Sequence, residues 1–333
     1  MSRRRALFAL ALAVAFAAAL PARAQQLFTY RADPVPEQVE AMYQKGLDWL
    51  VRNQTAQGGW NDSYGQQPAV IGLAVLAMLA HGDDPNFGPY AAPLRKALDA
   101  ILNARNPGNG YLGTSMYNHG FATLALAEAY GAVDDPRLGP ALEKSVDFLI
   151  SCQKRNPMGA WRYSPESQDA DTTVSGACIV ALLAARNAGI GVSEEAVNKA
   201  LLFYKQCQSG DGGFGYTGPS GSGAARTAIG GLAYALAKKK DTVVFKGAMR
   251  FLKQGADSEG NYYQHYYLYY AAQTYFHAGM EEWDPWNAGN MKALQSSQAS
   301  DGSWTGSHGT SFGTVASLLS LALNFRYLPI YER

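Results

Sequence analysis

The chain has 333 residues, of which 17% are charged, and its 28 Lys and Arg nearly balance its 27 Asp and Glu. Apart from the arginines at residues 3–5 and the short lysine run 238–240, no basic cluster or stripe is present, so the sequence lacks the electrostatic pattern of a nucleic-acid-binding protein. The three cysteines form no CxxC or Cys/His pattern, which excludes a zinc site of ordinary spacing.

The N-terminus has the pattern of a secretory signal peptide. Residues 3–5 are arginines, residues 6–20 are apolar, and residues 22–24 read Ala-Arg-Ala, a small-x-small cleavage site. Removal of residues 1–24 takes away four arginines and no acids, so 24 basic and 27 acidic residues remain, a net charge of −3. We therefore expect an exported protein, periplasmic or extracellular, with residues 25–333 as a single domain. An uncleaved N-terminal anchor is the alternative.

A unit of about 50 residues recurs six times, and such a period indicates an array of helical repeats. Each unit has a helix-forming stretch that ends near a glutamine, a glycine-rich turn, an aromatic residue and a second, apolar helix. The aromatic landmarks of units 1 to 6 are Trp60, Tyr111, Trp161, Phe214, Tyr262 or Tyr263, and Trp304.

Two kinds of helix alternate along the units. The first kind is amphipathic and is predicted over residues 37–54, 93–105, 140–154, 193–208, 243–254 and 287–298. The second kind is apolar all round and is predicted over residues 68–81, 117–130, 171–188, 224–238, 265–278 and 310–326. A helix without a polar face is buried on every side, so we expect six inner helices inside a belt of six outer ones. The apolar, aromatic tail 326–331 is expected to be ordered.

The cysteines are expected to be free, buried thiols. Cys152 and Cys207 each precede the glutamine of an outer helix, so they occupy equivalent places in neighbouring units. Packed helices lie about 8–10 Å apart, beyond the roughly 7 Å Cα separation that a disulfide tolerates. Cys178 is interpreted in the same way.

The turns carry a recognisable motif, K/R-G-x2-3-aromatic-Leu-x3-Gln-x2-5-Gly-x-Trp. Residues 45–60 match it fully, residues 144–161 match it except at Ser145, and residues 294–304 match its second half, whereas units 2, 4 and 5 are degenerate. The motif resembles the QW repeat of squalene–hopene cyclases and of the wider squalene-cyclase and protein-prenyltransferase superfamily. The resemblance covers the mature chain. It implies an all-α (α/α)6 toroid of six helix pairs, with a cavity for a hydrophobic isoprenoid or triterpenoid ligand.

Related toroids differ from this chain at their functional motifs. Prenyltransferases hold zinc with a D-x-C pair, but the comparable inner helices here begin Asp171-Thr-Thr and Ala225-Arg-Thr, without cysteine. The C-G-E-Q segment of complement-type thioester toroids is also absent. We therefore predict no metal and no cofactor.

Residues 169–173 read D-A-D-T-T and resemble the D-x-D-D motif of class II terpene cyclases. The resemblance implies that Asp171 is the proton donor and that Asp169 is its supporting acid. The alternative is that Asp171 caps the following helix by accepting backbone N–H bonds, which stabilises a helix by about 1 kcal/mol. Capping would hold the carboxylate ionised and lower its pKa, which opposes acid catalysis.

Further candidates lie near the first turns of inner helices, which should converge on one rim of the barrel. The predicted ligand-binding residues are His119, Arg226, Tyr263, His265, Tyr266 and His308. The two tyrosines belong to a tyrosine-rich run, 262–270, whose rings could stabilise a cation, stack on sugars or fill the core. Separate capping and loop hydrogen bonds are the alternative for the histidines.

Three functions follow as hypotheses. The first is an exported terpene-cyclase-like protein that binds an isoprenoid or triterpenoid and, if it is an enzyme, acts as an isomerase or lyase. The second is a non-catalytic toroid with a protein partner, which predicts a plugged centre. The third is a polysaccharide-active enzyme, which needs paired carboxylates or a Tyr/His/Arg set for lyase chemistry. No nucleic-acid partner is expected, and association with a membrane surface is left open.

Overall fold

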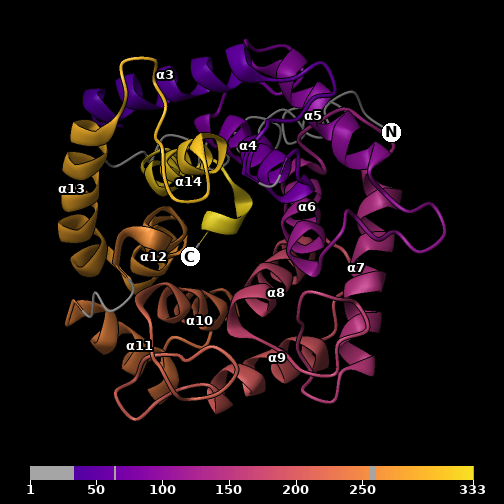
Figure 1. The fold of residues 1–333 in the computed structure, drawn as a ribbon, viewed down its shortest axis with the longest axis vertical. Coiled ribbons are helices and arrows are strands. Elements are labelled where there is room, and N and C mark those ends of the chain that lie inside the picture. Colours follow the sequence, from indigo (N-terminus) through magenta and orange to yellow (C-terminus); the bar gives the residue numbers. More distant parts are fainter. Residues whose placement is uncertain (1–33, 64, 256–259, 333) are drawn as a thin grey trace, which may run out of the picture. The chain divides into compact units, whose positions relative to one another are not determined.

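A computed structural model describes residues 34–63, 65–255 and 260–332. Residues 37–333 form one compact unit. The described residues contain twelve α-helices and three 3-10 helices, and no strands. Figure 1 shows the helices in two concentric rings, which confirms the predicted (α/α)6 toroid. The predicted signal peptide lies outside the described residues, and no described helix has the length and apolarity needed to cross a membrane.

The helices alternate between the two rings as predicted (Figure 1). The outer helices are α3 (Glu37–Asn53), α5 (Ala91–Asn103), α7 (Leu138–Arg155), α9 (Glu194–Gln206), α11 (Val243–Lys253) and α13 (Met280–Ser297). The inner helices are α4 (Pro68–His81), α6 (Met116–Ala129), α8 (Thr172–Asn187), α10 (Ala224–Leu236), α12 (Gln264–Ala278) and α14 (Thr310–Leu321). The largest difference is α13, which was predicted to begin after Pro285. It begins earlier because Trp283 and Trp286 pack their rings on Phe276 and Tyr275 of α12.

The inner helices pack closely because small residues face each other. A Cβ atom on Gly72 of α4 would lie 2.8 Å from the carbonyl oxygen of Phe121 in α6. A Cβ atom on Gly120 of α6 would lie 2.9 Å from the backbone of Ala177 in α8. Glycine is therefore required at these crossings, since any side chain would separate the helices.

The glutamine that ends the outer helix in units 1, 3, 4 and 6 bonds two neighbouring units together. The Gln54 side chain donates to the carbonyl of Gly58 in its own turn, at 3.1 Å, and to that of Pro93 in the next unit, at 2.8 Å. Gln153, Gln208 and Gln298 repeat both bonds with Gly159 and Ala196, with Gly212 and Val244, and with Gly302 and Met42. The Gln298 bond to Met42 joins unit 6 to unit 1 and closes the ring.

The two halves of the repeat motif meet across units. Trp60, Trp161 and Trp304 donate their indole N–H to Leu50, Leu149 and Leu294 at 2.8–3.0 Å, and all three are at most 2% exposed. Gly302, in the turn before Trp304 of unit 6, has φ +96°. A Cβ atom on Gly302 would lie 2.3 Å from the carbonyl oxygen of Lys45 in unit 1. The lysine-glycine half of one unit thus packs against the glycine-tryptophan half of another.

Two of the predicted landmarks are wrong: Tyr111 in unit 2, and Tyr262 or Tyr263 in unit 5. In units 4 and 6 the N–H of the buried landmark, Phe214 or Trp304, donates to a threonine hydroxyl. In unit 2 the equivalent N–H belongs to Leu112, which is fully buried and donates to His119. Tyr111 therefore sits one residue earlier, where the other units have Gly59, Ala160, Gly213 and Ser303. In unit 5, Tyr262 and Tyr263 are 52% and 41% exposed, so neither packs between units.

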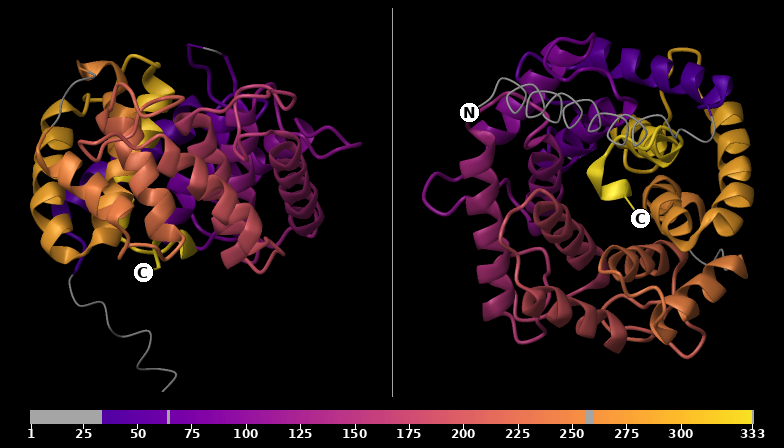
Figure 2. Two further views of the ribbon diagram at one scale, coloured as in Figure 1. Left: turned by 90° about the horizontal axis from the view of Figure 1, so that it is seen from below. Right: turned by 180° about the vertical axis from the view of Figure 1, so that it is seen from behind.

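The C-terminal tail closes one end of the inner barrel, in the middle of the ring (Figures 1 and 2). Ile330 and Tyr331 of the 3-10 helix η3 (Pro329–Tyr331) are 3% and 4% exposed. The Ile330 N–H donates to Glu128 in the last turn of α6, at 3.3 Å. Burial raises the pKa of Glu128 to about 8, so a largely protonated carboxyl lies beneath the tail at neutral pH.

Candidate functional site

A cavity of about 750 Å³ lies at the other end of the barrel, where the inner helices begin. Its walls come from all six units. The lining residues are Gln67, Ala69, Val70, Leu73, Thr114, Ser115, Tyr117, Asn118, Phe121, Tyr163, Thr173, Tyr216, Ala225, Arg226, Tyr262, Tyr263, Tyr266, His308 and Phe312. None of these is an aspartate or a glutamate.

The cavity is polar at its mouth and apolar further in. Leu73 and Phe121 lie more than a turn into α4 and α6, and both are buried. Gln67, Thr114 and Arg226 line the cavity from the loops and first turns, closer to solvent. A ligand in this cavity would therefore contact apolar groups with its inner part and hydrogen-bonding groups with its outer part.

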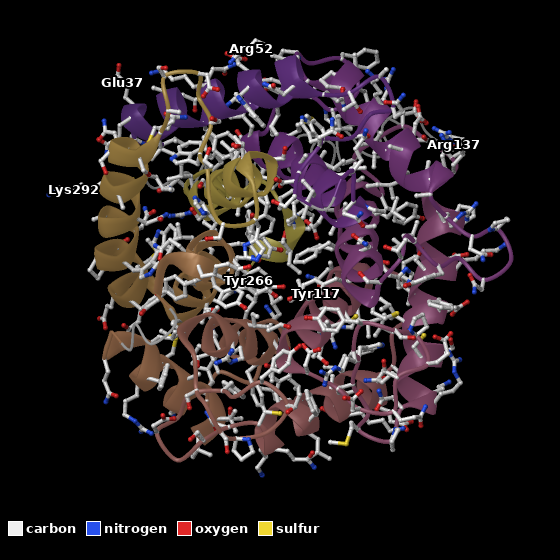
Figure 3. All side chains as sticks on the ribbon, viewed as in Figure 1. Glu37, Arg52, Tyr117, Arg137, Tyr266 and Lys292 are labelled. Carbon is white, nitrogen blue, oxygen red and sulfur yellow. The ribbon has the colours of Figure 1, made fainter. Side chains whose placement is uncertain are left out.

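Tyrosines form much of the wall. Figure 3 shows Tyr117 of α6 and Tyr266 of α12 close together near the centre of the ring, and their hydroxyls are hydrogen-bonded to each other. Tyr216 donates to the hydroxyl of Tyr163 at 3.2 Å. Burial raises the pKa of both Tyr117 and Tyr266 far above its usual range, so these rings are neutral phenols at any physiological pH.

Four of the six predicted ligand-binding residues line this cavity: Arg226, Tyr263, Tyr266 and His308. The His308 ring lies 5.1 Å from the ring centroid of Tyr262 and 5.8 Å from that of Tyr263. Burial lowers the pKa of His308, and the nearby Asp62 opposes that shift. The structure thus brings a cation, an imidazole and tyrosines to one mouth, while their role in binding stays a prediction.

The other two predicted histidines do not reach the cavity. His119 is fully buried, accepts a hydrogen bond from the Leu112 N–H through Nδ1, and donates from Nε2 to the Ser145 carbonyl at 3.0 Å. Burial lowers its pKa to about 4. His119 therefore joins unit 2 to α7, which was the alternative for these histidines. His265 lies against the backbone of Gly306 and does not line the cavity either.

Asp171 is a helix cap. Its Oδ1 accepts hydrogen bonds from the Thr173 N–H at 2.9 Å, the Val174 N–H at 2.8 Å and the Thr173 hydroxyl at 2.6 Å. The side chain is fully buried and does not line this cavity, whereas Thr173, two residues later, does. The expected fall in its pKa is wrong: burial raises the pKa of Asp171 by more than these bonds lower it. A raised pKa alone does not make it a proton donor, since the carboxyl does not face a ligand.

The supporting acid predicted for Asp171 lies elsewhere. Asp169 is mostly exposed and pairs with Arg162 at 2.7 Å on the surface. Neither aspartate of the D-A-D-T-T segment lines the cavity, and the proton-donor role of Asp171 stays a prediction.

The sequence analysis missed several wall residues. In four units a polar side chain near the start of the inner helix accepts a hydrogen bond from the backbone N–H of the buried landmark residue or, in unit 2, of Leu112. The residue two positions before that polar side chain lines the cavity in each case; these residues are Tyr117, Thr173, Ala225 and Phe312. Aligning the units on that polar residue would have identified them. Asp62 was also missed; it accepts from the Phe312 N–H at 2.6 Å beside His308.

No family model and no curated protein matches the chain. Solved structures do match. The α-1,6-mannanase GH76A of Salegentibacter sp. HEL1_6, with α-1,6-mannotetrose bound, has a TM-score of 0.68 at 10% identity, covering 88% of this chain and 100% of that one. The type II terpene cyclase MstE of Scytonema has a TM-score of 0.60 at 16% identity, covering 87% and 99%. The chain shares its toroid fold with both. At these identities the likeness shows the fold alone.

Proposed function

We propose that the protein binds an amphiphilic isoprenoid, with the prenyl chain inside the cavity and a polar head at its mouth. The observation that carries this proposal is the gradient from Leu73 and Phe121 in the interior to Gln67, Thr114 and Arg226 at the mouth. Each methylene that leaves water contributes about 0.8 kcal/mol, so even a short prenyl chain would be held firmly.

The mouth suits a polar or anionic head. The inner helices direct their N-termini toward it, and the positive ends of helix dipoles favour negative charge. The Arg226 guanidinium adds a cation that can bind a carboxylate or phosphate with two parallel hydrogen bonds. Neutral tyrosine rings between the two zones offer flat surfaces to double bonds.

The proposal is ligand binding without acid-initiated cyclisation by Asp171. A cyclase acid has to be protonated and has to face the alkene, whereas Asp171 accepts hydrogen bonds from the first turn of α8 and is not among the residues that line the cavity. The open cavity also counts against the toroid that acts only through a protein partner, because that hypothesis predicts a plugged centre.

The test is lipid binding. Native mass spectrometry of the purified protein should detect a co-purifying isoprenoid, and farnesol should bind in titration calorimetry. Ala69→Trp, which places an indole in the mouth, should abolish binding, while Ala104→Trp on the exposed end of α5 should not change it. Asp171→Asn should retain binding. Equal binding by both tryptophan variants would rule out the cavity as the site.

A second candidate is a lyase acting on an acidic polysaccharide. Paired carboxylates are missing from the cavity wall, but Tyr263, His308 and Arg226 together supply the Tyr/His/Arg set that such chemistry needs. Arg226 would bind a uronate carboxylate, neutral His308 would remove the proton next to it, and the Tyr263 hydroxyl would give a proton to the glycosidic oxygen that leaves. Ultraviolet absorbance of unsaturated products from a panel of uronate polysaccharides tests this, and His308→Ala should abolish any activity found.

Export is proposed on the N-terminal pattern. N-terminal sequencing of the protein recovered from outside the cytoplasm should begin at Gln25.

A further inference from the structure

A second hollow, of about 670 Å³, adjoins the central cavity at the rim between units 2 and 3. We call it the rim groove. It shares Thr114, Ser115 and Tyr163 with the central cavity, so the two hollows have a common wall. Its outer part is formed by the loop before α6, the C-terminal half of α7 and the loop that follows it.

The rim groove owes one wall to the irregular turn of unit 2. Tyr111 occupies a position that is glycine, alanine or serine in units 1, 3, 4 and 6. This is because Leu112, the next residue, is the one buried at the landmark position in unit 2. The Tyr111 ring packs on Phe148 at 5.0 Å between centroids, and both side chains remain partly exposed. Unit 2 therefore presents aromatic surface where the other units have only backbone or a small side chain.

The remaining wall is polar and carries no net charge. Asn109, Ser151 and Ser164 supply an amide and two hydroxyls. Arg155 and Glu166 both line the groove, so their charges offset each other. Aromatic surface for stacking, combined with neutral donors and acceptors, suits an uncharged ring that carries several hydroxyl groups, and suits neither an anion nor a hydrocarbon.

We propose that the rim groove is a second subsite, which binds a sugar-like ring attached to the head of the ligand in the central cavity. The inference rests on the proposed isoprenoid site and makes it more specific: the whole ligand would be a glycosylated isoprenoid. Tyr163, which lines both hollows, would lie at the junction between lipid and sugar.

Calorimetry with farnesol and farnesyl β-glucoside, both below their micelle concentrations, tests the subsite. The wild-type protein should bind the glucoside about tenfold more tightly, the effect expected of a few additional hydrogen bonds. Tyr111→Ser, which restores the residue type found in unit 6, should remove this advantage and leave farnesol affinity unchanged. Ser151→Trp, which fills the groove from α7, should do the same without touching the unit 2 turn.

Tyr130→Ser is the matched control, since Tyr130 is an exposed tyrosine at the C-terminal end of α6, away from the groove. It should leave both affinities unchanged. If farnesol binds and the glucoside binds no more tightly, the subsite is overturned while the central site stands. If farnesol itself does not bind, the proposed function fails and the subsite with it.

Discussion

The two ends of the inner barrel are built from the same helices and differ in almost every chemical respect. At the end where the inner helices begin, a cavity is lined by tyrosines, hydroxyls and Arg226, without a carboxylate. At the end where they finish, the chain's own tail fills the centre, and Glu128 is buried beneath it. The repeat creates the barrel, while segments outside the repeat decide which end is open.

The comparison separates structural carboxylates from candidate functional groups. Glu128 and Asp171 are both buried and both have raised pKa values, yet neither lines the cavity. A perturbed pKa is therefore a poor guide to function in this molecule, because burial inside a packed barrel is sufficient to cause it. The predictions below test this distinction between the ends.

The largest expected effect is at the closed end. Ile330→Asp would bury a second carboxylate beside Glu128 and should lower the free energy of unfolding by about 3–5 kcal/mol, as an uncompensated buried charge does. Chemical denaturation measures the change. Glu332→Gln, at an exposed position two residues later, is the control and should have little effect. A small loss for Ile330→Asp would mean that the tail does not close the barrel in solution.

Glu128 should make stability depend on pH in an unusual direction for a carboxylate. Burial raises its pKa to about 8 in the folded protein from an ordinary value of 4.5, so the folded state binds more protons between these values. Its contribution to the free energy of unfolding should therefore fall as pH rises from about 4.5 to about 8, by up to a few kcal/mol.

Glu128→Gln should remove this dependence. The variant should match the wild type near pH 5, where the carboxyl is protonated, and should be more stable near pH 9. Thermal melts across this range measure the difference, and parallel curves for the two proteins would show that Glu128 is not buried as described.

At the open end, Asp171→Asn should cost about 1 kcal/mol, the usual contribution of a helix cap. Asp169→Asn should cost little, because exposed ion pairs contribute little. Denaturation and farnesol titration should be measured together. Loss of ligand binding or of a catalysed reaction in Asp171→Asn, with stability preserved, would restore a functional role for this carboxyl.

An effect similar in size to that of Asp171→Asn is expected from the tyrosine pair. Tyr117→Phe and Tyr266→Phe each remove one of two hydroxyls that bond to each other, and each should cost about 0.5–1.5 kcal/mol. The double variant should cost less than the sum, because the second substitution removes a hydroxyl that has already lost its bond to the other tyrosine. Additive costs would show that the hydroxyls act independently.

The repeat made most of the fold predictable. The glutamine and the turn glycine recur because each contacts a neighbouring unit. In unit 6, Gln298 bonds to Met42 of unit 1, and Gly302 lies against Lys45 of unit 1. The single-residue shift in unit 2 could not be seen, because Tyr111 is aromatic like the true landmarks and Leu112 is not. Only the contact between the Leu112 N–H and His119 shows which residue is equivalent.

The site was predictable in part. Arg226 and His308 were identified from their place at the start of inner helices, and Tyr263 and Tyr266 from the tyrosine-rich run. His119 was misjudged for the same reason, since one position along a helix decides whether a side chain faces the centre or the outer ring. A motif resemblance likewise could not show that Thr173 lines the cavity while Asp171 caps α8 and does not line it.

Photolabelling with a farnesol that carries a diazirine tests the central claim most directly. If the open end binds the prenyl chain, peptide mapping should find adducts on the cavity walls, chiefly at Leu73, Phe121 and Phe312, and unlabelled farnesol should compete them away. Adducts confined to the outer helices, or to the tail around Ile330, would contradict the account.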